Sequence, residues 1–284
     1  MNYPDSNKLG PYQDANQTQP EEEPTSQSAA STHTRIDSSM STDEMIDFLR
    51  SRGVRGITDQ IDSSSATRFP TIVGGMSEVY EARLTDGSRV AIKCPRIDSW
   101  GDDMHMQLLL ERTARELYVW SKCAHPNLVP LIGMAQFRGQ ISLISPWMEN
   151  GTISQYLSHT SASLTTRYRM CEMISAVTTH LHDRGIAHGN IKGSKILVSK
   201  DGTPMLGGFG NAGLREMSFQ FSSVQSNTGF TMRWAAPELL IGECEMPTLY
   251  ADIYALGMVS LGLSLQVNPY IDPLIVSNYC ERKS

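Results

Sequence analysis

Two glycines and a lysine are the first residues in this sequence whose types and spacing could do chemistry. Gly74 and Gly75 stand between short apolar stretches, and Lys93 ends the run Val-Ala-Ile-Lys about twenty residues later. Backbone amides near glycines can approach phosphate groups closely, and a lysine supplies positive charge to them. Glycine turns are common, so neither element alone is strong support. Together, in this order, they suit a phosphate-binding site.

Strands are needed to hold these residues, and the surrounding pattern predicts them. Ile72–Val73 and Val79–Tyr80 flank the glycines as strand, turn and strand. Asp86–Gly87 is a hairpin turn signal before a third strand at Val90–Ile92. Later elements are predicted in the order of a helix over residues 104–123, a strand over 141–147, and mainly helices after residue 150. Strands first and helices later predict an α+β protein with two lobes.

A short helix is predicted ahead of these strands. Ser41 is a good N-cap, and Glu44 three residues later completes a capping box. Met40 and Met45 are placed to form a hydrophobic staple, and Gly53 ends the helix. We expect this helix to pack on the following domain, with a partner-binding helix as the alternative.

Further motifs follow along the chain in a fixed order. They are Arg115-Glu116-Leu117, His125-Pro126-Asn127, the stretch Ser145 to Gly151, the loop His188 to Lys195, Gly208-Phe209-Gly210, Ala236-Pro237-Glu238, and Asp252 with Gly257. One match would be chance, but the whole set resembles the protein kinase superfamily over about residues 69–269. The stretch 145–151 and Gly-Ile-Thr-Asp-Gln-Ile at 56–61 are most similar to tyrosine-kinase-like Ser/Thr/Tyr kinases of the fungal type.

The resemblance implies a bilobal kinase-like fold with an ATP site. It pairs Lys93 with Glu116 and makes residues 145–151 the hinge that binds adenine, with Ser145 as gatekeeper. The residues that it implies for ATP binding are Gly74, Gly75, Val79, Ala91, Lys93, Glu116, Ser145, Trp147, Met148 and Leu197. The predicted domains are a disordered polar arm at 1–40, an extension with a short helix at 41–66, the N-lobe at 67–145, a partial C-lobe at 146–271 and a tail at 272–284.

Three departures from the family pattern decide the predicted function. Asn190, followed by Lys192 in the catalytic loop, stands where kinases have the aspartate that accepts the substrate proton. An amide oxygen is a very weak base. Lys195 and Gly208 replace the two magnesium ligands, so we predict no metal site in the chain.

These losses predict a pseudokinase that acts in signalling as a scaffold or regulator. Losing a general base costs about 10²–10⁴ in rate, and losing metal stabilisation costs several kcal/mol more. We hypothesise that ATP still binds without magnesium, with Lys195 partly replacing the metal. The alternative is a Lys195 side chain that points to solvent and a pocket that stays empty. A weakly active kinase that uses a relocated carboxylate, such as Asp201 or Asp183, stays open as a second function.

Other parts of the kinase pattern are kept or changed. Ile72 and Ser77 replace two glycines of the glycine-rich loop, and Ile72 is expected to stiffen it. Phe209, His188 and Trp120 are expected to stack in the core. The serines and threonines between residues 208 and 238 are expected to lie on a surface loop.

The end of the sequence raises a third hypothesis. Few residues follow Pro269, and the late arginine that would pair with Glu238 is absent from its usual place. The helix predicted over 250–266 is apolar on nearly every side and would have one face exposed without later helices. Either a partner covers that face, or the product is truncated and unstable. We expect a C-lobe truncated after this helix, and a non-functional relic is the corresponding alternative function.

Composition excludes several classes of function. The formal net charge of -6 gives no basic face for nucleic acid. The first residues show no basic segment followed by an apolar run, so we expect no signal peptide. No apolar run is long enough for a bilayer, and we expect a cytoplasmic protein that does not bind membranes. The five cysteines include no Cys-x-x-Cys pair and are expected to be reduced. Signalling proteins, an active kinase among them, are the expected partners.

Overall fold

The computed structural model describes residues 40–96, 103–214, 233–243 and 248–265. Residues 1–39 of the predicted disordered arm, the tail at 272–284 and most of the segment between 208 and 238 lie outside these ranges. Met40, predicted as the last residue of the arm, is buried in the core. Side chains are described in the same ranges, except at residues 103–105, 214 and 265.

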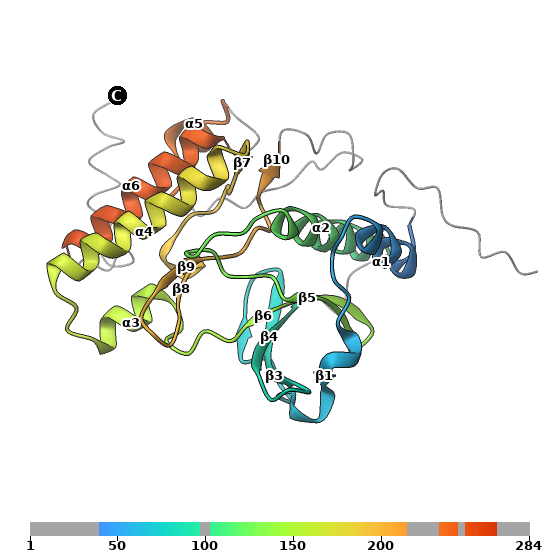
Figure 1. The fold of residues 1–284 in the computed structure, drawn as a ribbon. Coiled ribbons are helices and arrows are strands. Elements are labelled where there is room, and N and C mark those ends of the chain that lie inside the picture. The colour runs from blue at the N-terminus through green and yellow to red at the C-terminus, as the bar shows by residue number, and fades with distance from the viewer. Residues whose placement is uncertain (1–39, 97–102, 215–232, 244–247, 266–284) are drawn as a thin grey trace, which may run out of the picture. The chain divides into compact units, whose positions relative to one another are not determined.

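A curled antiparallel sheet forms the first part of the fold (Figure 1). Its strands follow the order β1-β3-β4-β6-β5, and β2 pairs with Glu78 and Val79 near the start of β3. Their bounds are β1 Ile61–Asp62, β2 Ile72–Val73, β3 Ser77–Leu84, β4 Arg89–Pro95, β5 Gly133–Phe137 and β6 Gln140–Pro146. The predicted strands around the glycines are thus confirmed, whereas β1 and β5 were not predicted.

The period of two along β4 separates the two faces of this sheet. Val90, Ile92 and Cys94 are buried in a cluster on one face, and Ala91 and Lys93 point to the other face. Directly opposite strand residues share a face, and the register opposes Val79, Lys93 and Leu143 in three neighbouring strands. This register carries the lysine to the side of the sheet that faces α2 and the helical part.

The helix α1 (Thr42–Ser51) begins as predicted and packs on α2 (Asp103–Ser121). The Ser41 hydroxyl accepts a hydrogen bond from the Glu44 N–H, and the Glu44 carboxylate accepts one from the Ser41 N–H at 2.8 Å. At the other end, Gly53 has a φ of 89°. The N–H groups of Gly53 and Val54 donate to the carbonyls of Arg50 and Leu49, which is the Schellman pattern.

One hydrophobic core joins α1, α2 and the helical part. Met40 and Met45, the predicted staple, are both at most 1 % exposed in this core. The Lys122 ammonium, just after α2, donates to the Arg52 carbonyl at 2.9 Å and ties the two helices together. The expectation that this helix packs on the following domain is therefore confirmed.

The second part of the fold is mainly helical. Its elements are α3 Ile153–His159, α4 Leu164–His182, β7 Ile186–Ala187, β8 Ile196–Val198, β9 Pro204–Leu206, β10 Gly213–Leu214, α5 Pro237–Leu240 and α6 Leu249–Leu265, with a short 3-10 turn at Gly193–Lys195. Two further 3-10 turns, at Thr58–Gln60 and Ser63–Ser65, flank β1 in the first part. The helices α4 and α6 lie side by side (Figure 1). The pairs β8–β9 and β7–β10 were not predicted, because strands of two or three residues leave no pattern. The predicted α+β bilobal fold is confirmed.

The helix α6 matches the apolar helix predicted over 250–266. Ala255, Val259 and Leu263 are buried against the core. Tyr250 and Ile253 are 83 % and 55 % exposed, so apolar side chains lie on both sides of the helix, as the sequence predicts.

The capping box gives a stability prediction. Ser41→Ala removes the side-chain acceptor for the Glu44 N–H, so the free energy of unfolding should fall by about 1 kcal/mol. Urea denaturation followed by circular dichroism measures this change. Ser63→Ala, at an exposed serine whose hydroxyl makes no hydrogen bond within the described ranges, is the control and should change stability by less than half as much. Equal effects of the two substitutions would contradict the role of the cap.

Candidate functional site

A cavity of about 330 Å³ lies between the glycine turn, β4, α2 and the loops that follow β7 and β9. Gly74, Gly75, Lys93 and Glu116 all line it, so the structure brings together the residues with which the sequence argument began. The later loops add Asn190, Lys192, Lys195, Gly208 and Asn211 to the lining.

Lys93 and Glu116 form an ion pair across this cavity wall. The Lys93 Nζ lies 2.5 Å and 2.6 Å from the two carboxylate oxygens. The Glu116 side chain is only 7 % exposed. Because one ammonium occupies both oxygens of a buried carboxylate, that carboxylate is largely neutralised. The pairing implied by the resemblance is present.

The Lys195 side chain lies against Gly208. A methyl group at position 208 would lie 2.9 Å from the Lys195 Cδ and 3.1 Å from its Nζ. The lysine therefore occupies the space next to the glycine where a side chain at 208 would stand. Lys195 is half-buried and lines the cavity, so the alternative in which it points to solvent is wrong.

Burial makes the charge on Lys195 costly. It lowers the pKa of the Lys195 ammonium from 10.5 to about 8, and the nearby Lys93 charge adds to this effect. The Glu116 carboxylate opposes the shift, and Lys192 reinforces it. Burial also lowers the pKa values of Lys192 and Arg112. Four cations and one carboxylate thus line this cavity.

The donor set of this cavity does not fit a magnesium ion. Magnesium prefers carboxylate, phosphate and water oxygens, but Glu116 is the single carboxylate in the lining and is paired with Lys93. The Asn211 side-chain oxygen accepts a hydrogen bond from the Arg112 guanidinium at 3.0 Å. Within the described ranges, no group of three or more His, Cys, Asp or Glu could hold a metal ion.

Other residues predicted for ATP binding lie outside this lining. Val79, Ala91 and Ser145 are on the sheet face, with Ala91 opposite Ser145, but they do not line the cavity; nor does Leu197 of β8. Trp147 and Met148 line a separate open groove that also includes Arg89, Pro130 and Glu149. The Trp147 N–H donates to the Arg89 carbonyl at 3.1 Å. The residues predicted to contact phosphates thus line one cavity. The hinge residues Trp147 and Met148, predicted to bind adenine, line the groove instead.

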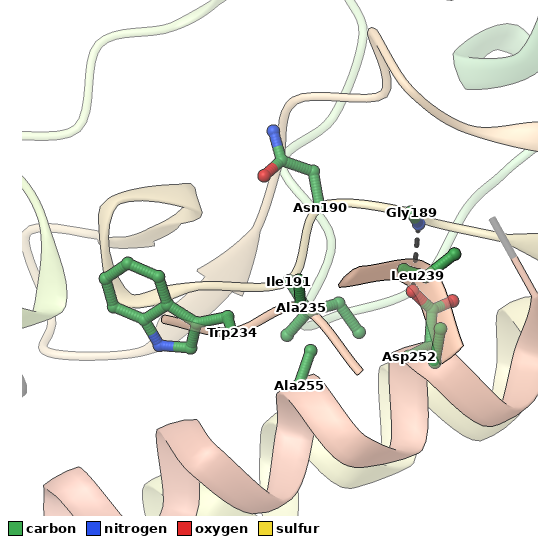
Figure 2. A pocket seen from close by; sticks show the side chains of 9 residues that line it. Gly189, Asn190, Ile191, Trp234, Ala235, Leu239, Asp252 and Ala255 are labelled. Carbon is green, nitrogen blue, oxygen red and sulfur yellow. Dashed lines mark hydrogen bonds between the residues drawn. The ribbon is translucent and has the colours of Figure 1, made fainter. Parts of the chain in front are cut away.

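The catalytic-loop segment is anchored on α6 through Asp252. Its carboxylate is 1 % exposed and accepts the N–H groups of His188 at 2.6 Å and Gly189 at 2.8 Å. Figure 2 shows the Gly189 bond among the residues that line a small cavity of about 20 Å³, which include Trp234 and Ala235. That volume holds about one water molecule. Figure 2 shows the Asn190 amide directed away from Asp252, and Asn190 also lines the larger cavity.

The predicted aromatic stack is present below the cavity. The Phe209 ring lies 6.0 Å from Trp120 in a stacked arrangement and 5.3 Å from His188 in a tilted one. All three side chains are at most 5 % exposed. Packing is therefore the role that the structure gives these residues.

Arg112 and Asn211 line the cavity and were not singled out in the sequence. Arg112 lies four residues before Glu116 in the same helix, so it shares the helix face of the carboxylate. That spacing could have identified it. No sequence spacing identifies Asn211 in the same way. Its position in the cavity lining depends on the path of the chain after Gly210.

Comparison with known proteins agrees with this geometry. The sequence profile of the protein kinase domain matches residues 73–279. The chain belongs to the protein kinase family. It is 31 % identical to phytosulfokine receptor 1 of Arabidopsis thaliana over 221 residues, which is 74 % of this chain and 21 % of that protein.

Further relatives carry kinase names as well. A probable serine/threonine-protein kinase of Dictyostelium discoideum is 28 % identical over 69 % of this chain and 20 % of its own length. The probable serine/threonine-protein kinase PknB of Lactococcus lactis is 31 % identical over 66 % of this chain and 29 % of its own length. The chain spans less than a third of the length of these relatives. None of the helices within the described ranges is long and apolar enough to span a membrane.

The buried ammonium of Lys195 gives a pH-dependent stability prediction. Its folded pKa of about 8 lies below the ordinary 10.5, so the unfolded chain holds this proton more firmly than the folded protein. The free energy of unfolding therefore gains from this group as the pH rises from 8 to 10.5, and the full cost is present below pH 8. Lys195→Met should raise the free energy of unfolding at pH 7 by up to about 3 kcal/mol.

Urea denaturation at pH 7 and pH 10 checks this prediction. The advantage of Lys195→Met over wild type should be largest at pH 7 and should shrink at pH 10. Lys200→Met, at an exposed lysine, is the matched control and should show neither effect. A Lys195→Met protein that is less stable than wild type at pH 7 would show that favourable contacts hold the ammonium.

Proposed function

We propose that this kinase domain is catalytically impaired, a pseudokinase that acts in signalling as a scaffold or regulator and binds ATP without magnesium. The observation that carries the proposal is the Lys195 side chain beside Gly208. In the family pattern, positions 195 and 208 supply the side-chain ligands of the metal. An ammonium in that space repels a divalent cation and can itself neutralise phosphate charge.

The proton-accepting step is also missing from the proposed site. Asn190 lines the cavity, but its amide can orient a hydroxyl and cannot usefully take its proton. Glu116, the one carboxylate of the lining, is paired with Lys93 through both oxygens. Transfer of a phosphoryl group to a protein hydroxyl therefore lacks both base and metal.

A relocated carboxylate, the basis of the weakly active alternative, receives little support. Asp201 is bound by the hydroxyls of Ser199 and Thr203 in the β8–β9 turn and lines the open groove instead of the cavity. Asp183 is the C-cap residue of α4. Neither residue lines the cavity that holds Lys93 and Asn190.

Nucleotide binding is supported by the residues that remain. Lys93 is positioned by Glu116, and Lys195 and Lys192 face the same cavity. We also propose that the chain falls in the tyrosine-kinase-like branch of fungal type, on the hinge sequence at 145–151, and that its partners are signalling proteins, an active kinase among them. The cytoplasm is the compartment that fits such partners.

A phosphotransfer assay tests the loss of activity. Wild-type protein with ATP and magnesium should label a generic protein substrate no faster than Lys93→Ala, because neither has a catalytic base or a metal site. Labelled phosphate incorporated into the substrate is the measurement. If the wild type labels the substrate and Lys93→Ala does not, the protein is an active kinase and the proposal is wrong.

Nucleotide binding with and without magnesium tests the second half of the proposal. ATP in EDTA should raise the melting temperature of the wild type, and magnesium should add nothing. The triple variant Asn190→Asp, Lys195→Asn, Gly208→Asp restores the family residues, so ATP should stabilise it only when magnesium is present. Absence of any shift with wild type in both buffers would refute nucleotide binding.

Circular dichroism melting of the wild type separates this proposal from the relic. A cooperative transition is expected, because one buried core joins α1, α2 and the helical part. A melt without cooperativity would favour the relic.

A further inference from the structure

We infer that Lys195 is a site of reversible carbamylation, at which its side-chain amine takes up carbon dioxide and becomes a carbamate. The ligand is a small neutral molecule, and the product is an anion on the wall of the cavity. The inference goes beyond the proposed function, because it concerns a covalent state of one lysine and holds whether or not the cavity binds nucleotide.

The backbone around Lys195 fixes the base of its side chain. The Lys195 N–H donates to the Lys192 carbonyl at 2.8 Å, and the Lys195 carbonyl accepts the Gly207 N–H at 2.9 Å. The side chain then lies beside Gly208, where an added Cβ would come within 3.1 Å of the Lys195 Nζ. The cavity of about 330 Å³ that Lys195 lines is far larger than one water molecule needs, so the three atoms of carbon dioxide have room there.

The surroundings of Lys195 disfavour its ammonium form. Among the residues that the structure describes, its Nζ makes no hydrogen bond or ion pair. The charged groups near it are Lys93 of β4, Glu116 of α2 and Lys192 of its own loop, and Arg112 of α2 lines the same cavity. The Glu116 carboxylate attracts the ammonium, but both of its oxygens are already paired with Lys93. A lysine that is partly desolvated beside other cations is a good nucleophile, because its neutral amine becomes accessible.

The amount of neutral amine decides how readily Lys195 can react. Burial, with the Lys93 charge adding to it, lowers the pKa of the Lys195 ammonium from 10.5 to about 8. At pH 7.5 the neutral fraction is therefore about 200-fold larger than for an amine with the ordinary value. A further titratable group near Lys195 is His188, whose buried imidazole has a lowered pKa and stays neutral at this pH.

The reaction needs only the amine and carbon dioxide. The lone pair of the neutral Lys195 Nζ attacks the carbon of carbon dioxide and forms an N–C bond. One C=O π bond opens and leaves its electron pair on oxygen, and the nitrogen releases one proton to water. Nothing is oxidised or reduced, and the side chain changes from a neutral amine to a monoanion.

The product suits the charge of the cavity better than the ammonium does. With an ammonium at Lys195, four cations and one carboxylate line the cavity, and carbamylation lowers this net charge from +3 to +1. The carbamate attracts Lys192 and Arg112, which the ammonium repels, and a charge-assisted hydrogen bond from either one stabilises the adduct. An anion at Lys195 repels the phosphates of a nucleotide, so carbon dioxide should oppose the metal-free binding proposed above.

Carbon-13 nuclear magnetic resonance of the full chain tests the inference, in ¹³C-labelled bicarbonate at pH 7.5 without nucleotide or metal. The wild type should show a carbamate signal that is absent from Lys195→Arg, whose guanidinium keeps the positive charge and replaces the amine. Lys200→Arg, at an exposed lysine, is the matched control and should keep the signal. Circular dichroism melting verifies that each variant is folded.

Trapping with triethyloxonium ion, followed by proteolysis and mass spectrometry, assigns the adduct to a residue. This step is needed because the α-amino group, with an ordinary pKa of about 7.7–8.0, is a competing amine. In the folded wild type, the adduct should be at least about tenfold more frequent at Lys195 than at Lys200. Lys192→Met should lower the adduct at Lys195 by about 3- to 10-fold, because it removes a neighbouring cation.

The same trapping in urea needs no variant. Unfolding removes the burial and the neighbouring cations, so the preference for Lys195 over Lys200 should vanish. A preference that persists in urea overturns the inference, because the folded site is then not its cause.

The outcomes also separate this inference from the proposed function. An adduct at Lys195 no more frequent than at Lys200, or an adduct confined to the α-amino group, overturns the inference and leaves metal-free nucleotide binding standing. An adduct at Lys195 in a protein that does not bind ATP supports the inference, whereas the nucleotide part of the proposed function then fails.

Discussion

The ion pair between Lys93 and Glu116 is the constraint on which the rest of the site depends. It joins β4 to α2 and fixes the distance between the sheet and the helix. It also engages both oxygens of Glu116, which is the single carboxylate among the residues that line the cavity.

The scaffold that carries a catalytic loop has been kept although its chemistry has changed. Asp252 still fixes the backbone at His188 and Gly189, and Phe209 still packs between Trp120 and His188. Loop position is set by these buried contacts and not by the side chains at 190, 195 and 208. Position 208 differs from the other two, because Gly208 has a φ of 86°, a backbone conformation that residues with a side chain rarely adopt.

The parts of the structure that could be predicted from sequence are those fixed by local rules. The cap at Ser41, the turn at Gly87 and the alternation along β4 each depend on neighbouring residues, and each is present. The nearness of Lys195 and Gly208 follows from matching two motifs to a family. The direction of the Lys195 side chain does not follow from that match. Whether that lysine faced solvent or the cavity depended on packing between segments far apart in the chain.

The lining of the cavity was harder to predict for the same reason. Arg112 and Asn211 are 99 residues apart in the sequence and form a hydrogen bond. No local sequence pattern predicts that the loop carrying Asn211 lies against this face of α2. Trp147 and Met148 line the open groove, whereas Lys93 and Glu116 line the cavity. This separation depends on the path of the chain at Trp147, which a motif match does not predict.

The packing of α1 shows that the physical domain and the region matched by the family do not begin at the same residue. The family match starts at residue 73, but the buried core starts at Met40 and includes Met45 and Leu49. Fully burying one such side chain contributes about 1.5–3 kcal/mol. A fragment that begins at residue 73 would expose the face of α2 that these residues cover. The unit that folds is therefore longer than the region that the family profile matches.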